Sequence, residues 1–235
     1  MKKTEKKKGY FTPFELILLS LSVLVIVVCF LIWDRVNYMR LFASLIGVVA
    51  LIVCAKGNPL GQIFMILFCI MYGIISWRYT YYGEMLTYLL MCLPMAIFSL
   101  VSWLKNPYDG NRSEVKVNRL SGKEIVFMLL TSALVTVIFY FILRYFNTAN
   151  LLFSTLSVTT SFAAAYLTLR RSPFFAFAYG LNDLVLIVLW TLAAFESVSY
   201  VSMVICFVAF LANDLYGFVS WLKMEKRQCS ETKIK

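Results

Sequence analysis

Apolar runs of about 20 residues, separated by short polar segments, recur along the whole chain of 235 residues. A helix needs roughly 20 mainly apolar residues to cross the hydrocarbon core of a bilayer. Eight segments meet this requirement: 14–33, 39–55, 60–77, 84–104, 123–146, 151–170, 174–193 and 198–222. With 61% hydrophobic and 14% charged residues, too little polar surface remains to cover a water-soluble globule. The sequence therefore predicts an all-α polytopic membrane protein with eight transmembrane helices.

Lysine and arginine residues gather on one side of these predicted spans. If the N-terminus is inside, all but four of the 22 Lys and Arg residues fall in the inner segments, the exceptions being Arg35, Arg40, Arg78 and Arg144. Cytoplasmic loops of membrane proteins carry this excess of positive charge. We therefore predict that the N- and C-termini are both cytoplasmic, and we interpret the net charge of +10 as topology rather than as a nucleic-acid surface.

Several classes of chemistry are poorly provided for in this composition. The chain has no histidine, and its six cysteines include no C-x-x-C pair and lie mostly in apolar runs, which favours buried packing roles. No G-x-x-x-x-G-K-[ST] motif is present for ATP binding. We therefore expect no metal and no cofactor. Two other classes of membrane protein remain as alternatives to the function argued below: a polytopic enzyme that acts on lipid head groups, and a structural scaffold.

Two stretches of the chain carry the same ordered series of residues. The first runs from Lys56-Gly57-Asn58-Pro59 to Ser102-Trp103-Leu104-Lys105, and the second from Arg170-Arg171-Ser172-Pro173 to Ser220-Trp221-Leu222-Lys223. Each contains a tryptophan and then an acidic residue that we predict to lie in an outer loop, Glu84 or Glu196. The copies begin four helices apart, so they have the same orientation, and duplication of this kind is typical of transporters.

This duplication predicts a 1+3+1+3 arrangement, in which two parallel three-helix bundles enclose a polar pathway. The predicted divisions are a basic N-terminus with an extra helix (1–38), a first bundle (39–104), a cytoplasmic loop with a linker helix (105–146), a second bundle (151–222) and a basic tail (223–235). The loop at 105–122 contains Asn, Pro and Gly with mixed charge, which indicates an irregular linker.

Two Asn-Asp pairs lie inside predicted spans. Asn182-Asp183 stands about ten residues into its span, roughly 15 Å deep, and Asn213-Asp214 is shallower. Polar groups at such depth face a cavity or another helix rather than lipid. Asp183 and Trp190 are seven residues apart and share a helix face. We predict that Asn182, Asp183 and Trp190 bind a flat polar substrate, with interhelical hydrogen bonding as the alternative.

Aromatic residues provide further candidates. Tyr72 and Tyr88 lie inside spans of the first copy and are candidate phenol donors to a substrate. Trp103 and Trp221 stand beside lysines at the inner ends of spans, so we predict that they belong to the interfacial aromatic belt. A predicted outer mouth, for which half of an aromatic belt is the alternative, consists of Trp77, Arg78, Tyr79, Tyr81, Tyr82 and Glu84.

Taken together, these motifs resemble those of the bacterial PnuC-type nicotinamide riboside transporters over about residues 39–224. The resemblance rests on the two Ser-Trp-Leu-Lys ends, Ser76-Trp77-Arg78-Tyr79 through Gly83-Glu84, Lys105-Asn106-Pro107-Tyr108, Ser113-Glu114-Val115-Lys116-Val117-Asn118, Asn182-Asp183, and Asn213-Asp214-x-Tyr216-Gly217-x-x-x-Trp221. The last of these is the most specific.

The resemblance implies a seven-helix core of 3+1+3 helices in the bacterial inner membrane, assembled as a homotrimer. It further implies import of nicotinamide riboside by facilitated diffusion for NAD biosynthesis, with a cytosolic kinase trapping the product, whereas close relatives move thiamine or other vitamins. It assigns stacking or hydrogen bonding with substrate to Asn182, Trp190, Asn213 and Tyr216. The first copy lacks equivalents, having Phe68, Cys69 or Ile70 opposite the Asn182-Asp183 pair, so we expect a lopsided site.

Overall fold

The computed structural model describes residues 10–78 and 81–234 of the chain. Its helical segments are α1 (Pro13–Trp33), α2 (Tyr38–Ala55), α3 (Leu60–Arg78), α4 (Tyr82–Leu86), a π-helical segment η1 (Thr87–Cys92), α5 (Leu93–Lys105), α6 (Gly122–Tyr145), α7 (Leu151–Leu169), α8 (Phe175–Ala194), a short 3₁₀ segment η2 (Val198–Tyr200) and α9 (Val201–Ile234). Because α4, η1 and α5 follow one another without a break, eight segments of the described chain are long and apolar enough to cross a membrane. The predicted eight spans are therefore confirmed.

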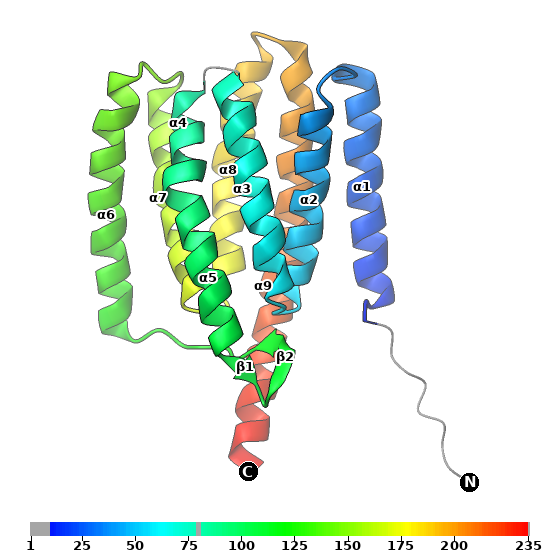
Figure 1. Ribbon diagram of the computed structural model, residues 1–235, viewed down its shortest axis with the longest axis vertical. Helices are drawn as coiled ribbons and strands as arrows, with labels where there is room; N and C mark the ends of the chain where they lie inside the picture. The colour runs from blue at the N-terminus through cyan, green and yellow to red at the C-terminus, as the bar shows by residue number, and fades with distance from the viewer. Residues whose placement is uncertain (1–9, 79–80, 235) are drawn as a thin grey trace.

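The spans run alternately up and down, so α1 begins and α9 ends at the same end of the bundle (Figure 1). We call this the termini end, and the other the opposite end. Helix α1 packs against α2 and α9, while α6 packs against α7 on the far side. Thr12 and Ser121 begin α1 and α6 with complete capping boxes, in which a glutamate three residues later binds back to the cap.

The segment between α5 and α6 is more ordered than an irregular linker. It forms an antiparallel pair of strands, β1 (Pro107–Tyr108) and β2 (Asn111–Val115), below the bundle (Figure 1). Gln228 of α9 donates to the Val115 carbonyl at 3.1 Å and accepts from the Val117 amide at 2.8 Å. Helix α9 therefore continues through the residues predicted as a separate tail, because the strands give its last turns a surface to pack on.

Two tryptophans make matching contacts between the two predicted bundles at the termini end. Trp103 Nε1 of α5 donates to the Thr168 carbonyl at the end of α7 at 2.9 Å, and Trp221 Nε1 of α9 donates to the Cys54 carbonyl at the end of α2 at 2.8 Å. Both tryptophans are 0% exposed. The prediction that they belong to an interfacial aromatic belt is wrong, because their indoles face the other bundle and satisfy carbonyls that a helix end leaves without a partner.

The serines before these tryptophans repeat the pattern. Ser102 Oγ donates to the Leu169 carbonyl at 2.9 Å, and Ser220 Oγ donates to the Ala55 carbonyl at 2.8 Å. Each Ser-Trp pair thus binds two successive carbonyls at the end of the first helix of the other predicted bundle. This reciprocity supports a parallel duplication, while the 1+3+1+3 grouping and its boundaries stay predictions.

Candidate functional site

A cavity of about 40 Å³ lies between α2, α3, η1, α7, α8 and α9. Among the described residues, those that line it include no lysine or arginine. Its aromatic and polar lining residues are Phe68, Tyr88, Ser161, Tyr179, Asn182, Asp183, Phe207, Phe210 and Asp214. Gly47 makes room for one of these rings, since a Cβ at that position would lie 2.3 Å from Phe210 Cζ. Aromatic rings with a few polar groups are typical of a small-molecule site.

The predicted pair Asn182 and Asp183 lies in this cavity. Asn182 is 2% exposed, and its Oδ1 accepts hydrogen bonds from Thr160 Oγ1 at 2.8 Å and Ser161 Oγ at 2.9 Å. Asp183 is 4% exposed, and its Oδ2 has no hydrogen-bond partner among the described residues. Helix α7 therefore fixes the amide, whereas part of the carboxylate remains available.

The lining differs between the two copies. Phe68 and Cys69, which the sequence comparison places opposite the Asn-Asp pair, do line the same cavity. The first copy therefore contributes a ring and a thiol where the second contributes an amide and a carboxylate. Asp214, which is not among the predicted binding residues, adds a second carboxylate. The available signal was its spacing of seven residues from Phe207, which puts both on one face of α9.

An aromatic layer closes the cavity toward the opposite end. We define this opposite layer as Tyr72, Tyr81, Trp190 and Tyr200. Trp190 is 1% exposed, its Nε1 donates to Tyr72 Oη at 2.9 Å, and its ring centroid lies 5.1 Å from that of Tyr81 and 5.6 Å from that of Tyr200. Burial raises the pKa of Tyr81 to about 12, so its hydroxyl stays neutral at physiological pH. Tyr72 and Trp190, both predicted site residues, thus lie together beside the cavity.

A second aromatic layer closes the cavity toward the termini end. This termini layer consists of Trp103, Phe175 and Trp221, whose ring centroids are 4.8 to 6.2 Å apart. Along α8, Phe175, Asp183 and Trp190 follow at intervals of seven or eight residues, or about 10–12 Å. The cavity therefore lies between two layers, and the structure represents a closed state.

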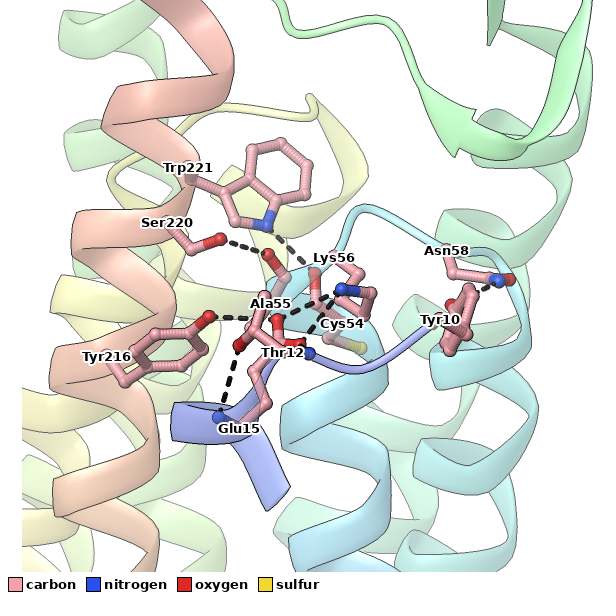
Figure 2. Close-up of polar contacts among 10 residues, drawn as sticks. All are labelled: Tyr10, Thr12, Glu15, Cys54, Ala55, Lys56, Asn58, Tyr216, Ser220 and Trp221. Carbon is pink, nitrogen blue, oxygen red and sulfur yellow. Dashed lines mark hydrogen bonds and ion pairs between the residues drawn. The ribbon is translucent and has the colours of Figure 1, made fainter. Parts of the chain in front are cut away.

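Two other predicted site residues, Asn213 and Tyr216, contact α1 and do not line the cavity. Tyr216 Oη donates to Glu15 Oε1 at 2.8 Å, and the same carboxylate pairs with Lys56 Nζ at 3.0 Å (Figure 2). Asn213 Nδ2 donates to Ser22 Oγ of α1 at 2.9 Å. Sequence reasoning missed this role of α1, for which the buried serine and glutamate in an apolar run were the only signal. Substrate binding by Asn213 and Tyr216 stays a prediction.

The predicted outer mouth is not assembled as expected. Trp77 is 62% exposed and lies apart from the cavity, so its role in binding stays a prediction. Tyr88, a predicted site residue outside the mouth, does line the cavity. Tyr79 lies outside the described residues. Glu84 is 1% exposed and accepts a hydrogen bond from Ser157 Oγ at 3.1 Å, so its placement in an outer loop is wrong. The helix begins at Tyr82, which turns Glu84 toward α7.

Comparison with known proteins identifies the family. A family model described as "Nicotinamide mononucleotide transporter" matches residues 37–223. The chain belongs to this family. A crystal structure described as that of the vitamin B3 transporter PnuC matches with a TM-score of 0.80 over 94% of this chain and 95% of that chain, at 22% identity, which shows a shared fold. No curated protein sequence matches.

Membership of this transporter family and the shared fold confirm the resemblance to PnuC-type proteins, and the eight apolar helices make the chain a multi-pass membrane protein. Helix α1 lies outside the matched range, yet it holds Asn213 and Tyr216 of the most specific motif. Five of the six cysteines are buried and all are free, as packing roles predicted. Among the described residues, no group of three or more His, Cys, Asp or Glu is arranged to hold a metal ion.

Proposed function

We propose that this family member imports nicotinamide riboside by facilitated diffusion, for use in NAD biosynthesis. The observation that carries the proposal is the closed cavity between two aromatic layers, lined by rings, one fixed amide and two carboxylates. Nicotinamide riboside combines a flat cationic ring with ribose hydroxyls and a carboxamide. Rings stack on the flat ring, carboxylates favour its charge, and Asn182 offers an amide for hydrogen bonds.

The charge of the lining favours the riboside over the mononucleotide. A phosphate group adds about −1.5 to −2 charges at pH 7 and seeks basic partners. The described lining offers Asp183 and Asp214 and no lysine or arginine. A phosphorylated substrate would therefore meet repulsion at this depth, whereas the riboside brings the positive charge that the cavity lacks.

Transport follows if the two layers open in turn. A cavity of about 40 Å³ has room for water but is far too small for a riboside, so the substrate enters only when one layer separates. The opposite layer is joined across the bundle by the hydrogen bond between Trp190 and Tyr72, and the termini layer by the bonds of Trp103 and Trp221. Alternate separation of these contacts exposes the cavity to one side and then to the other.

Uptake by liposomes that contain the purified protein tests the proposal. We expect saturable uptake of labelled nicotinamide riboside without ATP, with the internal concentration not exceeding the external one while the pH is equal on the two sides of the membrane. Nicotinamide mononucleotide should compete weakly. The absence of saturable flux would overturn the proposal. Stronger inhibition by thiamine, which is also an aromatic cation, would assign the same mechanism to a different vitamin.

A pair of cavity variants separates a binding role from general packing. Asn182→Ala should reduce uptake about tenfold or more, the effect expected when a polar contact worth about 1.4 kcal/mol is lost. Cys69→Ala is the matched control, because Cys69 lines the same cavity from the first copy. It should change uptake less than about twofold. Equal losses in the two variants would move Asn182 to the packing residues.

The remaining parts of the proposal concern the cell. We place the protein in the bacterial inner membrane with both termini cytoplasmic, as a homotrimer, with a cytosolic kinase that phosphorylates the imported riboside. Enclosing a riboside kinase and ATP in the liposomes should raise accumulated label above the external concentration.

Native mass spectrometry in mild detergent should detect three chains, and a single chain would overturn the trimer. Labelling of single cysteines at the two ends from outside the cell tests the orientation.

A further inference from the structure

Two carboxyl groups meet in the cavity, and none of the described residues that line it is basic. Asp183 of α8 and Asp214 of α9 are each 4% exposed, both line the cavity, and their carboxyl groups lie within hydrogen-bonding reach of each other. Ionised carboxylates only accept hydrogen bonds, so a bond between these two requires that one of them carries a proton. The partnerless Oδ2 of Asp183 shows that the described surroundings supply no donor to this atom.

The titratable groups around the pair do not supply a positive charge either. They are thiols and phenols, which are neutral when protonated. Those that line the cavity are Cys69 from α3, Cys92 and Tyr88 from η1, and Tyr179 from α8. Cys54 of α2 lies near enough to Asp214, and Cys206 of α9 near enough to Asp183, for their charges to interact.

The basic groups in described ion pairs belong to the ends of the bundle. Arg40 pairs with Asp34 at the opposite end, and Lys56 pairs with Glu15 at the termini end. Two negative charges side by side in the cavity would repel each other and lose their hydration together. The closed cavity therefore requires one positive charge, and its volume of about 40 Å³ leaves little room for anything larger than water.

We propose that the Asp183–Asp214 pair holds one shared proton in the closed, empty protein and that the cationic ring of the substrate displaces it. This inference rests on the proposed function. The charges balance: the pair with its proton carries −1, and the pair with both groups ionised carries −1 together with a monocationic substrate, while the proton leaves to water. The cavity keeps the same net charge whether it is empty or loaded. Neither state then faces the cost of an additional buried charge.

Counting the protons released on binding tests the exchange. Titration calorimetry with nicotinamide riboside, at one pH in buffers of different ionisation enthalpy, should show release of about one proton per bound substrate. Asp214→Asn should still bind but release about none. Zero release by the unaltered protein, or equal release by Asp214→Asn, overturns the inference. Proton release that disappears when sodium is present would assign the site to that ion and overturn the proton.

A second measurement needs no substrate, so it separates this inference from the proposed function. The infrared spectrum of the empty protein should contain a protonated carboxyl band that is lost in both Asp183→Asn and Asp214→Asn. Glu196→Gln, which changes an exposed carboxylate, is the matched control and should keep the band. If the band is present but nicotinamide riboside does not bind, the proton site stands and the proposed substrate fails. If no band depends on Asp183 and Asp214, the proton site fails whatever the substrate.

Discussion

The two aromatic layers that enclose the cavity differ in how they are held. Trp103 and Trp221 of the termini layer come from equivalent places in the two copies and bind each other's bundle through carbonyls. The counterpart of Trp190 in the first copy, Trp77, is 62% exposed and lies outside the opposite layer. The indole of Trp190 binds one tyrosine hydroxyl, that of Tyr72. The contacts therefore match the predicted duplication in the termini layer and depart from it in the opposite layer, which contains tyrosines.

This difference suggests distinct roles in transport. A layer held by matched bonds to main-chain carbonyls resists separation from either side. A layer held by a bond between two side chains separates when one of them changes rotamer. We therefore expect the termini layer to dominate stability and the opposite layer to respond more readily to substrate.

The largest expected effect tests the symmetry of the termini layer. Trp103→Ala and Trp221→Ala should each lower the free energy of unfolding by about 3–5 kcal/mol, because each removes a fully buried ring and leaves a cavity. Denaturation in detergent, followed by circular dichroism, measures the loss. Trp77→Ala is the control, since this ring is 62% exposed. If one buried variant loses less than half as much unfolding free energy as the other, the contacts of Trp103 and Trp221 are not equivalent.

A smaller effect isolates the bond in the opposite layer. Trp190→Phe and Tyr72→Phe remove the same hydrogen bond, so each should cost about 0.5–1.5 kcal/mol, with additional small packing terms. The double variant should cost little more than the worse single one, because the bond is lost only once. A double-mutant cycle on unfolding free energies measures this coupling. Additive losses would show that the bond contributes nothing to the layer.

The serines that precede Trp103 and Trp221 differ in their contacts, so their variants should differ in stability. Ser220→Ala removes one bond to a carbonyl and should cost about 0.5–1 kcal/mol. Ser102→Ala should cost more, because Ser102 Oγ also accepts a hydrogen bond from Arg171 Nη1 at 2.8 Å. Thermal unfolding detects such differences as shifts of about 2–4 °C per kcal/mol. A larger loss for Ser220→Ala would contradict the arrangement of these contacts.

The smallest expected effect is a loss of stability at alkaline pH. It should arise in the opposite layer, because the termini layer contains no titratable side chain. Because the folded state raises the pKa of Tyr81 to about 12, its contribution to stability is complete below pH 10 and is lost as the pH rises toward 12. Over this range, the melting temperature of the unaltered protein should fall more than that of Tyr81→Phe. Parallel curves for the two proteins would show that Tyr81 is not buried as described.

The sequence was sufficient for the spans and for the family, because both depend on local patterns. An apolar run as long as 123–146 is expected to form a membrane-spanning helix, and the helix observed there is Gly122–Tyr145. Capping residues such as Thr12 act on their own helix, so their role is readable without a fold. The Asn213 to Trp221 motif is short and specific, and it indicated the family that the comparison confirms.

The facing of side chains could not be predicted in the same way. A tryptophan beside a lysine at the end of a span, such as Trp221, suits both the lipid interface and a neighbouring helix. Only the Cys54 carbonyl, 167 residues away in the chain, decides between them. Tyr216 is a similar case, since its partner Glu15 belongs to a helix outside the family match. Contacts between distant segments carry no local sequence pattern.

The π-helical segment η1 has a consequence for the far end of its own span. A π turn takes up one residue more than an α turn, so it shifts the angular phase of everything that follows by about 100°. Trp103 lies 11 residues beyond Cys92, the last residue of η1. Removing one residue from η1 and restoring a regular α-helix would therefore swing Trp103 away from the other bundle. The contact between Trp103 and the Thr168 carbonyl therefore depends on a single extra residue beside the cavity, about 16 Å away along the helix.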